Sequence, residues 1–327
     1  MESDVNKKLV ANVLNCIPKN KKPAMYLVNT LNISRESAYR RIRGDIPFTI
    51  QELVTLAVNL EFSIDHIFDQ EKQNHTFLDI LRMGENTNDF FLLMLEKYNG
   101  LLENLSHAKN LEVLTALNSF PPPFYVNFSN IFKFTYYKWL YQDSEIFRNT
   151  SYSDIVLPEE AVVLQKKIKE NMNQKVNVTL ILDVKIFLNL IKEVQYFYHR
   201  KLLTDGELLL LKDDILRLID QYEEFSQTGS YGSVGIQLYL SSLCINSNTA
   251  CYKYDDKTEA LFWMFTINPV IIQNSGFAPI QMKWLNSLKR QSALITQSNE
   301  IMQADFFSQQ KDYIEQYLSV DNAIGAI

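Results

Sequence analysis

The sequence is poor in residues that build covalent or metal-stabilised sites. Its 327 residues include only three cysteines, Cys16, Cys244 and Cys251, with no CxxC pair, so neither a disulfide framework nor a zinc ribbon is expected. The three thiols are predicted to be free and buried. The four histidines are scattered, without the HExxH spacing of a zinc site. We expect no metal site and no other cofactor.

Long uninterrupted apolar runs are also missing. The longest, VTLILDVKIFLNLI and LFWMFTINPVII, are broken by Asp183 and Lys185 or are too short to cross about 30 Å of hydrocarbon. The first ten residues place acids ahead of lysines and lack an apolar signal core followed by a cleavage site. The sequence predicts a cytoplasmic protein without a membrane-spanning helix.

Enzyme motifs are absent or badly placed. No GxSxG occurs, and no cysteine has an evident histidine partner. The segment GSYGSVG precedes an expected strand, whereas a phosphate-binding loop joins a strand to a helix. Adjacent acids such as Glu159 and Glu160 point in different directions on a helix and cannot share one substrate. We therefore predict that the protein is not an enzyme and has no catalytic residues.

Charge is unevenly distributed along the chain. The whole sequence has 32 Lys and Arg against 38 Asp and Glu, a net charge of −6. Residues 1–50 hold nine basic and four acidic side chains, a balance of +5, which leaves 23 basic and 34 acidic side chains, or −11, for the remainder. A basic N-terminal segment on an acidic body indicates a phosphate-bearing partner for that segment.

The N-terminal segment has the spacing of helices joined by a tight turn. Apolar residues recur at positions 10, 13, 14 and 17, so a first amphipathic helix is expected to end at Pro18. A second helix should begin at Pro23, a favoured first helical position, and end at Asn32. Asparagine tolerates the left-handed backbone conformation that a tight turn between helices requires.

A third helix is expected directly after this turn. Ser34 suits its N-cap, and Gly44 stops it after residues 35–43. A fourth helix from about Thr49 and a short fifth one after Ser63 would complete the domain. The expected organisation is a helix-turn-helix domain over residues 1–70 and a second domain over residues 71–327.

The segment LVNTLNISRESAYRRIRGD, followed by FTIQELVTLAVNLEFSIDHIF, resembles the lambda-repressor-like (XRE-type) helix-turn-helix regulators of bacteria. The resemblance covers about residues 8–70 and implies a five-helix domain whose third helix is the recognition helix. Arg41 occupies a position that is commonly apolar in that family, and Ile42 is expected to replace it in the core. The usual glutamine at the start of the second helix is absent, which leaves Lys21 and Lys22 to meet phosphate.

The third helix also suits DNA on physical grounds. If Ala38 and Ile42 point inward, its solvent face presents four candidate base readers, Arg35, Glu36, Ser37 and Arg40. Arginine can read guanine through two hydrogen bonds, glutamate can accept from a cytosine amino group, and serine can serve either way. Two residues nearer the edge, Tyr39 and Arg43, suit backbone oxygens. These six residues and Lys22 are the predicted DNA-binding set.

One helix-turn-helix makes few contacts, so we expect a homodimer on two half-sites of double-stranded DNA. The prediction is a sequence-specific transcriptional regulator that inserts its third helix in the major groove. The alternative is a protein-interaction adaptor that keeps the fold without reading DNA. A steep fall in affinity with salt would characterise the regulator, whereas the adaptor would form no DNA complex even at low salt.

The region beyond residue 70 is expected to be mostly helical. Helices are predicted over residues 158–173, 182–203, 207–225, 279–295 and 299–318. LEVLTAL is a short strand candidate, and three further strands near residues 234–267 predict a small antiparallel sheet. The expected fold class is therefore mainly α, with a five-helix N-terminal domain and a larger, mostly helical effector and dimerisation domain.

An aromatic segment, PPPFYVNFSNIFKFTYYKWLYQ, stands out in this second region. It could line a cavity for an unknown effector, form a dimer interface or simply fill a core. From this segment to the C-terminus the sequence is similar to the C-terminal part of poorly characterised regulators of Bacteroidetes, through Trp139, the stretch QYFYHRKLL, residues 284–288 and the pair Phe306 and Phe307. The resemblance implies a regulator but names no ligand.

Overall fold

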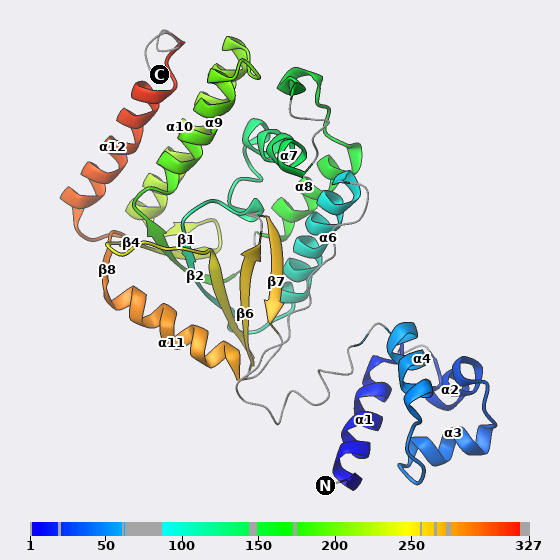
Figure 1. The fold of residues 1–327 in the computed structure, drawn as a ribbon. Coiled ribbons are helices and arrows are strands. Elements are labelled where there is room, and N and C mark those ends of the chain that lie inside the picture. Colours follow the sequence, from blue (N-terminus) through cyan, green and yellow to red (C-terminus); the bar gives the residue numbers. More distant parts are fainter. Residues whose placement is uncertain are drawn as a thin grey trace. The chain divides into compact units, whose positions relative to one another are not determined.

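The computed structural model describes residues 2–18, 21–60, 62, 87–143, 149–172, 175–255, 257–264, 267–272 and 276–320. The chain divides into two compact units, Met1–Phe77 and Leu78–Ile327, which are drawn in Figure 1 and treated separately below. Within the described ranges, no helix combines the length and the apolar character needed to cross a membrane.

The N-terminal unit is built from four described helices, α1 (Glu2–Cys16), α2 (Pro23–Leu31), α3 (Arg35–Ile42) and α4 (Ile50–Leu60). Their facing apolar residues form one core, made of Leu9, Val10, Val13, Ile17, Leu27, Ala38, Phe48 and Leu56. The residues from α1 recur at helical spacing, as the sequence predicted, and α1 packs against α3 and α4. The expected fifth helix after Ser63 lies outside the described residues.

The second unit is built on a mixed sheet of eight described strands. The strands are β1 (Glu112–Leu117), β2 (Asn177–Asp183), β3 (Ser230–Tyr231), β4 (Val234–Ser241), β5 (Thr249–Tyr254), β6 (Lys257–Met264), β7 (Asn268–Ile272) and β8 (Ser292–Leu294). They follow the order β3-β4-β2-β1-β5-β6-β7, and β8 pairs with β4. β1, β2 and β4 run parallel, whereas β5, β6 and β7 continue antiparallel from β1.

Helices cover the two faces of this sheet unequally. The large core on one face is formed with six described α-helices and two short 3-10 helices. The α-helices are α6 (Thr87–Ser106), α7 (Ser129–Asp143), α8 (Glu159–Asn171), α9 (Ile186–His199), α10 (Asp205–Thr228) and α12 (Glu300–Tyr317). The 3-10 helices are η2 (Pro122–Phe124) and η4 (Tyr152–Asp154). A smaller core on the opposite face packs against α11 (Phe277–Arg290), as Figure 1 shows. The second face is therefore only partly covered by described helices.

The expected fold class, mainly α with a small antiparallel sheet, is wrong for the second unit. The stretch NVTLILD was not predicted as a strand, and its last two residues were assigned to a helix beginning at Leu182, but it forms β2 in the middle of the sheet. A parallel strand buried on both faces is a continuous apolar run, and periodicity alone does not separate it from a buried helix. β2 links β1 to β4, so the separate strand candidates belong to one substantial mixed sheet.

Two further expectations about this sheet need correction. The three strands expected near residues 234–267 do not form a separate antiparallel sheet, because β4 pairs with β2, β3 and β8 while β5 pairs with β1 and β6. The helix expected to reach residue 295 ends at Arg290, and the next residues form β8. α10 begins with a capping box, since Thr204 Oγ1 accepts from the Glu207 amide and the Glu207 carboxylate accepts from the Thr204 amide.

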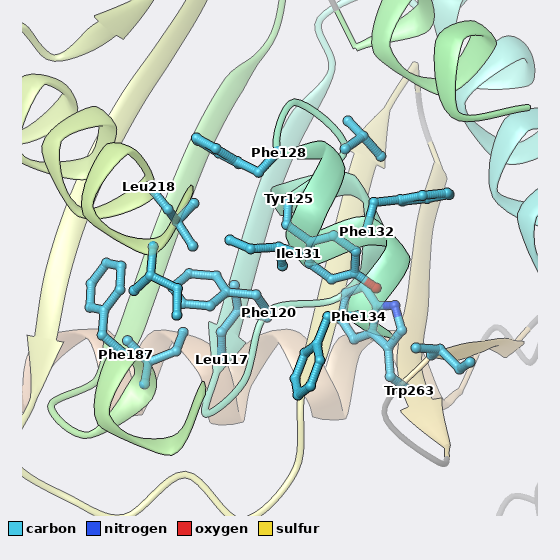
Figure 2. Close-up of a cluster of buried hydrophobic side chains, with 14 of the residues drawn as sticks. Leu117, Phe120, Tyr125, Phe128, Ile131, Phe132, Phe134, Phe187, Leu218 and Trp263 are labelled. Carbon is cyan, nitrogen blue, oxygen red and sulfur yellow. The ribbon is translucent and has the colours of Figure 1, made fainter. Parts of the chain in front are cut away.

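The aromatic segment fills the larger core. Figure 2 shows Phe132 and Phe134 from α7 among side chains contributed by other elements, namely Phe187 of α9, Leu218 of α10 and Trp263 of β6. Phe134 and Phe197 meet edge to face, with ring centroids 5.4 Å apart, a favoured arrangement for aromatic pairs. The middle of α7 is buried on nearly all sides, as expected if this segment fills a core.

The cysteines only partly match the expectation of buried thiols. Cys251 is buried between the sheet and α11, and burial raises the pKa of its thiol to about 12. Cys16 is half-buried and Cys244 is exposed. The prediction of buried thiols is therefore wrong for Cys16 and Cys244.

Candidate nucleic-acid interface

The helix-turn-helix is formed by α2, a short turn and α3. Pro23 lies in the first turn of α2, and Asn32 ends that helix in the left-handed conformation, with φ 51° and ψ 46°. Ser34 then begins α3, because its hydroxyl accepts a hydrogen bond from the Ser37 amide at 3.1 Å. Each of these features was predicted from its residue type, and together they fix how α3 leaves α2.

The exposed side of α3 carries a run of polar side chains. Arg35, Glu36 and Arg40 are exposed, and Tyr39 is 43% exposed. Positions 35, 36, 39 and 40 fall on one side of a helix, opposite Ala38, which is fully buried. Within the described part of the chain, Arg35, Glu36 and Arg40 take part in no salt bridge, so their charged groups face solvent without a partner.

The side chain of Arg41 points into the domain, unlike those of Arg35 and Arg40. It is buried, and its guanidinium binds the Glu52 carboxylate of α4 in two places, Nη2 to Oε1 at 2.7 Å and Nε to Oε2 at 3.1 Å. Its Nη1 also donates to the backbone carbonyl and the hydroxyl of Ser37. The predicted register therefore needs revision here, because Arg41 shares the inner side of α3 with Ala38 and the half-buried Ile42.

This pairing also changes the position of Ser37. Its side chain is half-buried and its hydroxyl is bound to Arg41, so it lies at the edge of the exposed side. Of the four candidate base readers, the structure brings Arg35, Glu36 and Arg40 together on one solvent-facing surface and sets Ser37 apart. We call these three residues with Tyr39 the α3 outer face.

Glu52 joins α3 to α4 and was not singled out from the sequence. Its carboxylate accepts from the Thr49 amide at 2.8 Å, and the Thr49 hydroxyl accepts from the Glu52 amide at 3.2 Å, which makes a capping box. Burial raises the pKa of this carboxyl, but the Thr49 amide and the Arg41 guanidinium outweigh burial and leave the pKa lowered. The spacing of Thr49 and Glu52 could have revealed the cap, but not the ion pair.

The two remaining predicted contacts lie at the borders of the motif. Lys22 is exposed at the N-cap of α2, where unpaired backbone amides give the helix end a positive potential. Arg43 is exposed just after α3, and its guanidinium binds Asp45 at 2.9 Å. That neighbour removes part of the positive charge that Arg43 would offer to a phosphate.

Residues 7–87 match the sequence profile of the BetR domain, a helix-turn-helix-like domain found in bacterial regulators. The match includes α2, α3 and α4 and spans about a quarter of the chain. No curated protein and no solved structure matches the chain. The lambda-repressor-like resemblance and the resemblance of the C-terminal region remain predictions, whereas the helix-turn-helix character of the N-terminal unit rests on both the profile and the geometry.

Proposed function

We propose that the protein is a transcriptional regulator whose N-terminal unit binds double-stranded DNA with α3 in the major groove. The observation that carries this proposal is the α3 outer face, where Arg35, Glu36 and Arg40 face solvent without ion pairs in the described chain. The opposite side of α3 packs against α1 and α2, and Arg41 reaches Glu52 of α4, so the α3 outer face is the side left to meet a partner.

The chemistry of the α3 outer face suits base edges. Arg35 and Arg40 are long, carry fixed charge and present the paired donors that match O6 and N7 of guanine. Glu36 supplies an acceptor for a cytosine amino group, and it disfavours positions that present only acceptors. We assign Tyr39 and Lys22 to the phosphate backbone that flanks the groove, where the α2 N-terminus would add its own amides.

The Arg41–Glu52 pair holds this surface in place. It ties the last turn of α3 to the first turn of α4, and the Thr49 cap fixes the same carboxylate. An arginine that anchors the recognition helix from within cannot itself read a base. We infer that Arg41 is a positioning residue. The four arginines of this segment would then have three roles: Arg35 and Arg40 contact bases, Arg41 holds α3 in place, and Arg43 at its end is partly neutralised by Asp45.

The proposal includes a homodimer, because a short helix reads only a few base pairs and regulators of this kind address two half-sites. Selection of DNA fragments by the purified full-length protein, followed by sequencing, tests it. We expect an enriched motif with two similar half-sites about 10 base pairs apart, or a multiple of one helical turn. A single half-site, or a monomer in light scattering with and without the selected DNA, would reject the dimer.

The residue assignment has its own test. Replacing Arg35 and Arg40 by alanine together should weaken binding to the selected fragment by about 2–6 kcal/mol in a gel-shift assay, since each good arginine–guanine contact contributes about 1–3 kcal/mol. Circular dichroism should not change, because both side chains are exposed. The matched control replaces two exposed lysines of α8, Lys167 and Lys169. Equal binding by both double variants would contradict the assignment.

One observation favours the alternative, a protein-interaction adaptor that does not read DNA. Burial of Arg41 and the pairing of Arg43 with Asp45 leave a smaller free positive charge on α3 than the sequence suggests. The ionic-strength dependence separates the two functions. A regulator that contacts several phosphates should lose affinity steeply as salt rises, whereas an adaptor should form no DNA complex even at low salt.

A further inference from the structure

The face of the sheet that packs on α11 is left uncovered by the described residues towards the amino ends of its parallel strands. One row across that face consists of Gly235, Asn177, Glu112, Lys253 and Thr258, which are neighbours in the ladder from β4 to β6. The next row contains Gln237, Thr179 and Leu114. These two rows form the floor of a groove of about 1370 Å³, and α11 and residues 296–298 line its walls.

The walls of this groove are basic. Lys283 and Lys289 line it from α11, and Lys253 rises from the floor. Among the described residues that line the groove, Glu112 is the single acid, and it lies opposite Lys253 in the ladder. No salt bridge involves any of the three lysines within the described residues. This arrangement contrasts with the remainder of the sequence beyond residue 50, where acids outnumber bases 34 to 23.

One lysine is held over the floor by its neighbours. Lys289 Nζ donates to Gln237 Oε1 at 3.4 Å and lies 5.0 Å from the centroid of the Tyr239 ring. Neither the Gln237 amide nor the Tyr239 ring carries a full negative charge, so the Lys289 ammonium can still bind an anion. Beyond it, a second hollow shares Lys283 and Lys289 and adds Arg290. The positive surface therefore continues along α11.

The floor offers hydrogen-bonding groups of both kinds. The amides of Asn177 and Gln237 each contain a donor and an acceptor, and the Thr179 hydroxyl serves either way. A side chain at Gly235 would place its Cβ only 2.7 Å from Asn177 Oδ1, so glycine leaves room for this amide to lie across β4. A peptide backbone, which also alternates donors and acceptors, matches such a floor better than a ligand that only accepts.

Size and shape also favour a peptide. The groove volume of about 1370 Å³ exceeds the roughly 300–1,000 Å³ of ordinary small-molecule pockets. The floor extends across β4, β2, β1, β5 and β6 and is open to solvent, which suits an extended chain. Met282 and Pro279 on the α11 wall provide apolar contact beside the lysines.

We propose that this groove binds an acidic peptide segment of a protein partner in an extended conformation. The lysines would meet carboxylates of the peptide, and the floor amides would pair with its backbone. Complementary charge of this kind accelerates association and selects the partner more than it raises affinity. The groove would thus give the second unit an interaction site of its own, independent of DNA binding by α3.

A random peptide library displayed on phage, panned against the full-length protein, tests this proposal. We expect the recovered peptides to be enriched in Asp and Glu. Replacing Lys253, Lys283 and Lys289 by glutamine should weaken the binding of a recovered peptide by about tenfold or more in fluorescence polarisation, since each exposed ion pair contributes up to about fivefold in affinity. The matched control replaces Lys167, Lys169 and Lys175 by glutamine, an equal change of charge at exposed positions outside the groove.

The remaining outcomes are decisive. Peptides without acidic enrichment, or equal binding by the groove variant and its control, would overturn the proposal. Loss of peptide binding in the Arg35→Ala and Arg40→Ala variant would place the acidic site on α3 and overturn it as well. If the groove variant lost DNA affinity by the same factor and peptide binding stayed unchanged, the groove would be a nucleic-acid surface. Failure of DNA binding alone would leave the groove proposal standing.

Discussion

Two positively charged surfaces lie in different units of this protein, and they are built in opposite ways. The α3 outer face is convex and uses arginines on a short helix, whereas the α11 groove is concave and uses lysines around a sheet floor. The planar guanidinium of arginine donates to two acceptors at once, whereas lysine presents a compact charge on a flexible side chain that can adjust to the position of a carboxylate. The two surfaces should therefore differ in what they recognise.

The supports beneath the two surfaces differ as well. α3 is held by a buried ion pair and a capping box, so its geometry depends on Glu52 and Arg41. The groove floor is held by backbone ladders of neighbouring strands, which do not depend on any one side chain. A single substitution should consequently disturb the DNA surface far more than the groove.

The largest effect is expected at Arg41. Arg41→Ala leaves the half-buried Glu52 carboxylate without its cation, which costs about 1–3 kcal/mol, and the N-terminal unit should open more often. Hydrogen–deuterium exchange of α3 and α4 peptides measures this opening in the full chain. Tryptophan fluorescence reports on the second unit alone, because Trp139, Trp263 and Trp284 all lie there, and it should not change.

Two variants separate loss of the ion pair from other damage at this site. Arg40→Ala on the same helix removes an exposed charge and should leave exchange within α3 and α4 unaltered. The double variant Arg41→Met with Glu52→Gln keeps the capping acceptor and removes both charges, so it should recover much of the stability. If the double variant exchanges as fast as Arg41→Ala, the ion pair is not what holds α3.

The next effect separates arginine from lysine chemistry. Replacing Arg35 and Arg40 by lysine keeps the charge but removes the paired donors, so discrimination between selected and random DNA should fall by about 1–3 kcal/mol. Non-specific binding and its salt slope should stay close to those of the native protein. The measurement is a competition gel shift with both DNA types.

The reverse exchange in the groove should matter little. Replacing Lys253, Lys283 and Lys289 by arginine keeps the three charges. The affinity for the peptide should stay within about threefold if each lysine forms a single ion pair of up to about 1 kcal/mol. Equal tolerance of both surfaces to the exchange would remove the distinction between them. In that case the α3 outer face would bind phosphates rather than base edges.

A smaller effect follows from pH. The pKa of Glu52 is lowered below its ordinary value of 4.5, so its contribution to folding is complete above the unfolded pKa and is lost as pH falls through the folded value. Exchange in α3 and α4 should therefore rise as pH falls below about 4.5, after correction for the intrinsic rate. Glu52→Gln should flatten this dependence. An equally steep rise in the glutamine variant would assign the transition to other carboxyls.

The two units also differ in how far the sequence predicted them. In the N-terminal unit Pro23, Asn32 and Ser34 mark their own helix boundaries, because their backbone preferences act locally, and the structure follows them. Arg41 was the exception, since its ion pair joins residues from two helices and leaves no local pattern. The exposed side of α3 could be predicted from the sequence, but the hydrogen bond from Arg41 to the Ser37 hydroxyl could not.

The second unit depends on contacts between distant segments. β1 pairs with β5 about 135 residues later in the chain, and no local pattern reveals such a partner. Only the second half of NVTLILD is buried, with the apolar run Leu180–Leu182 covered on both faces, and so short an apolar run is consistent with either a helix or a strand. The groove could not be expected either, because Asn177, Gln237 and Lys253 meet only through the register of the sheet.

The smallest expected effect concerns the border of the DNA surface. Arg43 and Asp45 are both substantially exposed, at 60% and 45% of their side chains, so their ion pair contributes little to stability, about 0–1 kcal/mol. Asp45→Asn should free the guanidinium for a phosphate and raise DNA affinity a few-fold, with a salt slope steeper by about one. Glu170→Gln on α8, which removes the acid of another exposed ion pair with Lys166, is the control. If Asp45→Asn leaves the salt slope unchanged, Arg43 lies outside the DNA contact and the footprint of α3 ends at Arg40.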